Sequence, residues 1–170
     1  MLDAGRGFTS TAVTFDSVAA ASGITRGGII YHFRSREDLI GAIHLYLAQR
    51  WEQQLEAACG KPAADATESE RLIAYVRVAT TSATRAELLM LLESPHSEHQ
   101  RVWSDVIERW IPSHDTPTVG APSSRMLALL AADGLWVNDA IGSNRIPPAE
   151  RQDAAEQIVS LIHDASGSAR

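Results

Sequence analysis

The sequence predicts an all-α protein in which a small N-terminal three-helix head precedes a larger helical bundle. Through most of the 170 residues, apolar side chains recur at the three- and four-residue spacing of a helix face. Residues that cap helices, threonine or serine before a segment and glycine after it, stand at the ends of several of these segments. No segment alternates apolar and polar residues between hairpin turns, as a half-buried strand would. We place the head at residues 1–45 and the bundle at residues 46–170.

The first two expected helices are short and closely spaced. Thr14 is placed to cap a helix over residues 14–21, and Gly23 follows where a left-handed C-terminal residue belongs. Thr25 is placed to cap a second helix over residues 25–33. Two short helices joined by a tight turn have the dimensions of a helix-turn-helix.

The longer helices follow. Ser35 and Asp38 resemble a capping box and open a helix whose apolar stripe continues to about Ala58. Proline and glycine indicate connecting segments at residues 60–65 and 112–122. Between and beyond these segments the apolar spacing predicts helices over residues 69–82, 88–92, 102–111, 123–142 and 148–165.

The composition excludes several classes of protein. The hydrophobic content of 45% is too high for a disordered chain. The single cysteine, Cys59, forms neither an internal disulfide nor a cysteine-rich zinc cluster. No apolar run approaches the roughly 18 residues of a membrane helix, and the start of the chain lacks the apolar core of a secretory signal. We therefore expect a cytoplasmic protein without a membrane partner.

The charge is unevenly distributed along the chain. The net charge of −6 by itself argues against a nucleic-acid partner, because phosphate binding requires a basic surface. However, the stretch between Asp16 and Glu37 holds three arginines and His32 but no acid. This asymmetry indicates separate tasks for the two parts, although three arginines over such a length are also compatible with ordinary solvated surface.

The turn and the second helix carry a specific resemblance. Residues 23–39 read Gly-Ile-Thr-Arg-Gly-Gly-Ile-Ile-Tyr-His-Phe-Arg-Ser-Arg-Glu-Asp-Leu: a Gly-apolar turn, a short helix ending in aromatic residues, and a Ser-Arg-Glu opening of the next helix. The pattern resembles the DNA-binding signature of the TetR family of bacterial transcriptional regulators, and the similarity covers about residues 5–50. It implies a dimeric repressor that binds a palindromic operator on double-stranded DNA and is released by a small-molecule effector.

The roles of the family's residues can be assigned to the matching positions of this sequence. The resemblance then implies that the second helix lies in the major groove. Arg26 is the expected base reader, because its guanidinium fork suits the acceptor edge of guanine. Tyr31 and His32 are expected at phosphates or bases; the alternatives are partial packing of Tyr31 and a surface position without contact for His32. Gly28 has no side chain and would permit close approach to DNA. The residues expected to contact DNA are Thr14, Thr25, Arg26, Gly28, Tyr31, His32 and Arg36.

One departure concerns the first helix of the head. In the family this helix normally begins well before a Gly-Phe pair such as Gly7-Phe8, whereas six residues precede the pair here. We therefore expect a truncated first helix, through either a late start codon or a clipped chain. A helix of about one turn is marginal by itself, so we expect the head to bind DNA less tightly.

The resemblance gives the bundle two tasks, effector binding and dimerisation. Residues 123–142 are apolar on most sides, which is typical of a helix buried in a core or in a subunit interface. The residues expected in a homodimer interface are Leu127, Ala131, Gly134, Leu135, Val137, Ile158 and Ile162. The residues expected to line an apolar effector pocket, which plain core packing would also explain, are Met90, Leu91, Trp103, Trp110, Met126, Leu130 and Asp133.

Two other functions stay open at this point. One is a helical interaction protein that keeps an impaired head. The other is a metal-dependent helical-bundle enzyme, because His96 and His99, with acids nearby, are residue types that suit zinc. The sequence contains neither a phosphate-cradling glycine loop nor a nucleophile elbow, so we expect no enzyme and no bound cofactor or metal.

Overall fold

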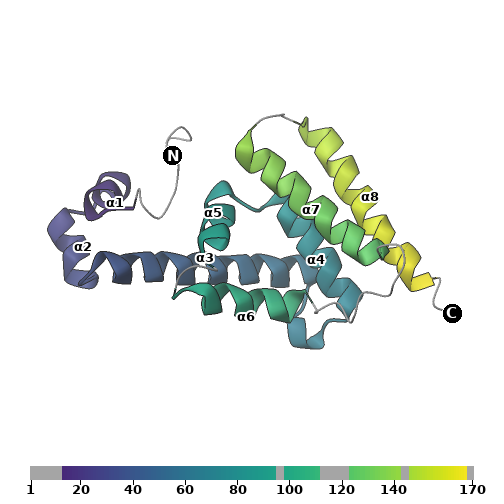
Figure 1. The fold of residues 1–170 in the computed structure, drawn as a ribbon, viewed down its shortest axis with the longest axis horizontal. Coiled ribbons are helices and arrows are strands. Elements are labelled where there is room, and N and C mark those ends of the chain that lie inside the picture. The colour runs from purple at the N-terminus through teal and green to yellow at the C-terminus, as the bar shows by residue number, and fades with distance from the viewer. Residues whose placement is uncertain (1–12, 95–97, 112–122, 143–145, 168–170) are drawn as a thin grey trace.

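The computed structural model describes residues 13–94, 98–111, 123–142 and 146–167, and within these ranges every regular element is a helix (Figure 1). The prediction of an all-α fold is therefore confirmed. The expected truncation of the first helix falls within residues 1–12, outside the described residues. The elements are α1 Phe15–Ser22, α2 Arg26–His32, α3 Arg36–Cys59, the 3₁₀ turn η2 Ala63–Asp65, α4 Glu68–Thr81, α5 Arg85–Glu93, α6 Gln100–Trp110, α7 Ser124–Ile141 and α8 Pro148–Gly167.

Hydroxyl side chains fix where most of these helices begin. The hydroxyl groups of Thr14, Thr25 and Ser35 each accept a hydrogen bond from a backbone N–H in the first turn of α1, α2 and α3, as the sequence predicts. Thr84 does the same for α5 and forms a capping box with Glu87, whose carboxylate bonds back to the Thr84 backbone N–H. This box starts α5 at Arg85, earlier than the expected helix over residues 88–92.

The long helix α3 connects the head to the bundle. Its 24 residues span about 36 Å, since an α-helix rises about 1.5 Å per residue. Helices α1 and α2 lie at one end of α3, and α4 to α8 gather along the rest of its length (Figure 1). The boundary that we placed between residues 45 and 46 falls inside this continuous helix, so head and bundle share one rigid element.

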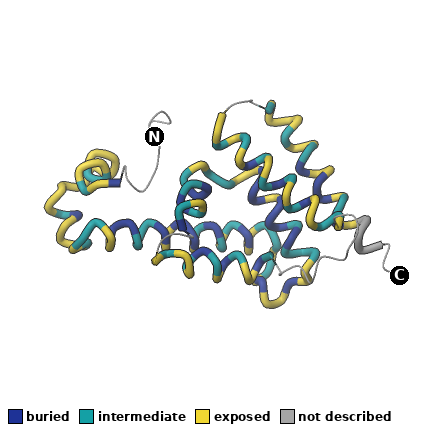
Figure 2. The backbone as a smooth tube through the Cα atoms, in the orientation of Figure 1, coloured by how far each residue is buried: buried dark blue, intermediate teal, exposed yellow. Residues whose placement is uncertain are grey.

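Most of the hydrophobic core lies in the bundle, where α4 packs against α3, α7 and α8. The Trp51 and Trp136 rings stack with their centroids 4.6 Å apart, and Trp103 and Trp110 are fully enclosed. Figure 2 shows buried positions running along the bundle, whereas most of α1 and α2 is exposed or intermediate. The head adds a small core around Ile29, which packs in the same continuous cluster of buried side chains.

A buried polar contact holds α6 against α3. The indole N–H of Trp103 donates to Nδ1 of His44 over 2.9 Å, and the His44 ring stacks on that of His99 at a centroid distance of 4.6 Å. A Cβ atom at Gly41 would stand 3.2 Å from Cε1 of His99, so the glycine leaves room for this ring. Because an indole only donates, Nδ1 of His44 is an acceptor, and the neutral ring carries its proton on Nε2.

Burial favours the neutral form of His44. Desolvation lowers the pKa of His44, the neighbouring His99 lowers it further, and Glu93 acts in the opposite direction. An unfolded chain takes up this proton near the ordinary pKa of about 6.5, whereas the folded chain takes it up only at lower pH. The contribution of neutral His44 to the free energy of unfolding is therefore complete above a pH of about 6.5. It is lost as the pH falls from there toward the lowered pKa of His44 in the folded chain.

We expect the free energy of unfolding to decrease as the pH falls from 7 to 5, with a smaller decrease in the variant His44→Phe. That variant loses the acceptor for Trp103 and is less stable at pH 7 by about 1–3 kcal/mol, but it has no proton to take up at this position. Urea denaturation across this pH range, followed by helical circular dichroism, measures both effects. His163→Gln, at an exposed histidine of α8, is the matched control. Equal slopes in wild type and His44→Phe would contradict the assignment.

Candidate nucleic-acid interface

The turn between α1 and α2 has a defined geometry. Gly23 adopts φ 72°, in the left-handed region, and its N–H donates to the Ala19 carbonyl over 3.0 Å, which ends α1. Two residues later Thr25 caps α2 through a 3.1 Å bond from the Gly28 N–H. The result is a helix-turn-helix with α2 as its second helix.

Helix α2 has one inward face and one outward face. Ile29 is the residue of α2 that is buried, and Phe33 packs beside it at the C-cap. On the outward face, Tyr31 is 84% exposed and its ring meets that of His32 edge to face. Arg26 is also exposed and forms an ion pair with Asp16 of α1, with 3.1 Å between Nε and Oδ1. Arg26, Tyr31 and His32, all three of which are predicted to contact DNA, are thus exposed on α2.

The other predicted contact residues have structural tasks as well. Thr14 and Thr25 are exposed, and their hydroxyl oxygens serve as caps. A Cβ atom at Gly28 would lie 3.1 Å from Ile24 Cγ2 and 3.2 Å from Thr25 Oγ1, so the capped turn itself favours glycine there. Arg36 is half-buried and donates from Nε to the Val13 carbonyl over 2.9 Å, which ties α3 to the segment before α1.

The seven residues expected to line an effector pocket are divided between core and surface. Met90, Trp103 and Trp110 are buried and Leu91 is half-buried, whereas Met126 and Leu130 are exposed on α7. Asp133 accepts a 2.6 Å hydrogen bond from the Tyr75 hydroxyl. Burial raises the pKa of Asp133 despite this bond, and burial followed by the Asp133 charge raises the pKa of Tyr75 well above its usual range.

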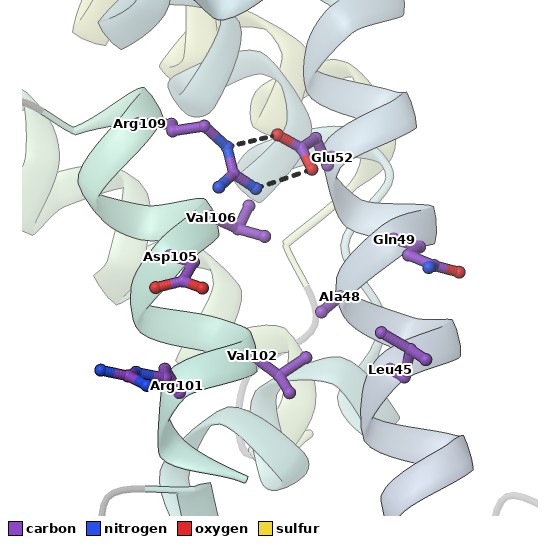
Figure 3. A pocket seen from close by; sticks show the side chains of 9 residues that line it. All are labelled: Leu45, Ala48, Gln49, Glu52, Arg101, Val102, Asp105, Val106 and Arg109. Carbon is purple, nitrogen blue, oxygen red and sulfur yellow. Dashed lines mark hydrogen bonds and ion pairs between the residues drawn. The ribbon is translucent and has the colours of Figure 1, made fainter.

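An open groove of about 360 Å³ lies between α3 and α6 and contains none of these seven residues (Figure 3). Val102 and Val106 of α6 point into it across from Ala48 of α3. At one end Arg109 binds both carboxylate oxygens of Glu52, at 2.8 and 2.9 Å. This pair could not be predicted from the sequence, because its members lie 57 positions apart and neither stands in a recognisable motif.

The predicted dimer residues separate into three groups. Leu127, Gly134 and Val137 are exposed on α7, and with Met126, Leu130 and Ile141 they form one exposed stripe along the helix. We call these six residues the α7 stripe. Ala131 and Leu135 are half-buried beside it. Ile158 and Ile162 of α8 lie instead in the core of the single chain.

The residues considered for a metal-dependent enzyme are only partly described. His96 lies outside the described residues, and His99 stacks on His44. Among the side chains that the structure does describe, histidine, cysteine and carboxylate residues form no group of three or more that would hold a metal ion. In the same part of the chain, no helix is both long and apolar enough to cross a membrane.

Two family models match the chain. Residues 4–43 match the model for bacterial regulatory proteins of the tetR family, and residues 69–163 match the model for the C-terminal domain of Tetracyclin repressor-like proteins. No curated protein matches the chain. The first match contains the helix-turn-helix, and the second runs from α4 to α8. The chain therefore belongs to the TetR family and is a DNA-binding transcriptional regulator.

Proposed function

We propose that this regulator is a homodimeric repressor that binds a palindromic operator through α2 and is released from it by a small-molecule effector. The observation that carries the proposal is an exposed recognition helix in the same chain as an exposed apolar stripe on α7. One helix-turn-helix reads one half-site, and a second copy supplies the other. Such a protein acts on DNA in the cytoplasm and needs no catalytic chemistry.

In the proposed complex the outward face of α2 enters the major groove. Arg26, at the first position of α2, reads a base edge, while Tyr31 and His32 contact phosphate or bases further along the helix. The Thr14 and Thr25 hydroxyl groups and the Arg36 guanidinium lie nearer the backbone, where they position the head. Gly28, which has no side chain, permits close approach.

The second copy is proposed to pack on the α7 stripe. Leu130, at its centre, is 55% exposed, and Gly134 has no other heavy atom near the position of a Cβ atom, so another helix can approach closely. The exposed positions of α8, in contrast, are mostly polar, with Gln152, Asp153, Glu156, Gln157 and Ser160 among them. Ala131 and Leu135 border the stripe. Ile158 and Ile162 support it from the core.

The effector is proposed to act through α6. Trp103 and the Arg109–Glu52 pair connect α6 to α3, and α3 carries the head. A ligand that enters among the buried residues of α5 and α6, with Met90, Leu91, Trp103 and Trp110 as its proposed contacts and Asp133 nearby, would displace α6. Such a ligand releases DNA only if it binds the displaced arrangement more tightly than the arrangement that fits the operator.

We expect Arg26→Ala to weaken binding to a preferred duplex by about 1–3 kcal/mol and to relax the base preference at one position of each half-site. If Tyr31 contacts a phosphate, Tyr31→Ala weakens binding to all duplexes more evenly, because a phosphate contact carries no sequence information. The duplex is first selected from a random library with the full chain, and affinities are measured by fluorescence anisotropy at several salt concentrations. Arg77→Ala, at an exposed arginine of α4, is the control. Equal losses in all three variants would contradict the placement of α2.

We expect Leu130→Glu to convert the dimer to a monomer, because it places a charge at the centre of the apolar contact. Sedimentation velocity at micromolar concentration distinguishes the two states. Gln157→Glu adds the same charge to a polar, exposed position of α8 and should leave the dimer intact. A Leu130→Glu chain that still sediments as a dimer would show that the subunits meet on another surface.

We expect the wild-type chain to lower transcription from a promoter that contains the selected duplex, and Arg26→Ala to weaken this effect. The measurement is a reporter assay in a bacterial host, with a scrambled duplex in the same promoter as control. A small molecule that acts as the proposed effector restores expression in the wild-type strain and also releases the labelled duplex from purified protein. Increased transcription in the presence of the wild-type chain would identify an activator.

A further inference from the structure

An acidic side chain lies on the helix-turn-helix, beside the arginine that is proposed to read a base edge. Asp16 lies in the first turn of α1, and its side chain is 77% exposed. It does not cap α1, because Ser17 completes the capping box with Thr14. Near a phosphate backbone a carboxylate is repelled, so its presence here lowers the affinity of the head for DNA of any sequence.

The contact that Asp16 makes is with the proposed base reader. Its Oδ1 atom lies 3.1 Å from Nε of Arg26, which opens α2, so the pair joins the N-terminal ends of the two helices of the motif. Both side chains are exposed, and exposed ion pairs contribute little to the stability of a fold. The ion pair itself therefore adds little stability, and the remaining stabilising effect of the acid is that of a negative charge at the N-terminus of α1.

The geometry of the pair suits the recognition of guanine. Arginine has five N–H donors in a planar fork, and the Asp16 carboxylate lies beside the Nε side of this fork. The two terminal nitrogens are then the donors that lie furthest along the side chain. Guanine O6 and N7 accept two parallel hydrogen bonds from such a fork. A side chain that is already held loses less rotamer freedom when it binds than one that is free.

We propose that Asp16 is a specificity-determining residue that positions Arg26 toward a base edge and away from phosphates. The inference rests on the proposed function, in which α2 enters the major groove. The carboxylate acts in two ways: it attracts the guanidinium from the Nε side, and it repels the backbone phosphates with which the arginine would otherwise pair. The head thereby gives up affinity for DNA in general and gains discrimination between sequences.

The variant Asp16→Asn tests this assignment, with Glu37→Gln as its matched control. Both acids are exposed, both lie in the first turn of a head helix, and both substitutions remove one negative charge. Affinities of the full chain are measured for the duplex that the wild type selects from a random library and for a scrambled duplex of equal length. Thermal melting of each variant confirms that it folds, and we expect melting points close to that of the wild type.

We expect Asp16→Asn to bind the scrambled duplex more tightly than the wild type, and the ratio of the two affinities to fall by about tenfold, within the range of one bidentate guanine contact. Duplexes selected with Asp16→Asn show a weaker preference for guanine opposite Arg26. Glu37→Gln raises both affinities together and leaves the ratio unchanged. When Arg26→Ala is already present, Asp16→Asn no longer changes the ratio, because the side chain that it positions is absent.

Two results would overturn the assignment, and they have different meanings. If the wild type selects a preferred duplex but Asp16→Asn keeps the wild-type ratio, or changes it only as Glu37→Gln does, Asp16 is an ordinary surface acid and the proposed function stands. If the wild type shows no preferred duplex, sequence-specific operator binding fails, and the role of Asp16 fails with it.

Discussion

Helix α3 packs against both the DNA-binding head and the helical bundle, and the positions of all the other helices depend on these two contacts. Near its N-terminus Leu39 and Ile40 are buried in the head, and further along Trp51 and Leu55 are buried in the bundle. A continuous helix between these two contacts is stiff. A tilt of about 5° at one end of a rod of roughly 36 Å moves the other end by about 3 Å. Small changes in bundle packing therefore become displacements of the recognition helix.

The contact between α3 and α6 determines how such a tilt could arise. At its centre stands His44, a buried acceptor whose partner Trp103 only donates. A buried polar pair of this kind stabilises one arrangement when it is satisfied and opposes it when it is not. The bidentate Arg109–Glu52 pair, further along the same two helices, adds a second point of attachment at the solvent side. Helix α6 is thus fixed to α3 by directional bonds, which have discrete broken and intact states.

The features that could be predicted most accurately from the sequence are the helix ends, because neighbouring residues determine them. The caps at Thr14, Thr25 and Ser35 and the left-handed Gly23 depend on neighbours within four residues, and all four were predicted.

Features that depend on tertiary packing were harder to predict. Residues 123–142 were recognisably apolar on most sides, but only the packing of α4, α5 and α8 against α7 determines which side is left exposed. For the same reason Leu130 could be assigned to a pocket although it lies on the surface. Pairs such as Trp103–His44, separated by 59 residues, leave no periodic signal at all.

The proposed dimer and the helix-turn-helix constrain each other through α3. A two-fold axis on the α7 stripe would fix the position of each bundle, and α3 then fixes how far apart the two heads lie. Operator half-sites recur at about 34–36 Å, one turn of DNA, or at multiples of it, so the distance between the heads has to match that repeat. A tilt of both α3 helices in opposite directions changes the distance by the sum of the two displacements. Tilts of a few degrees therefore move the two recognition helices out of register with consecutive major grooves. Each head still fits one half-site by itself, but the two heads no longer fit both half-sites at once.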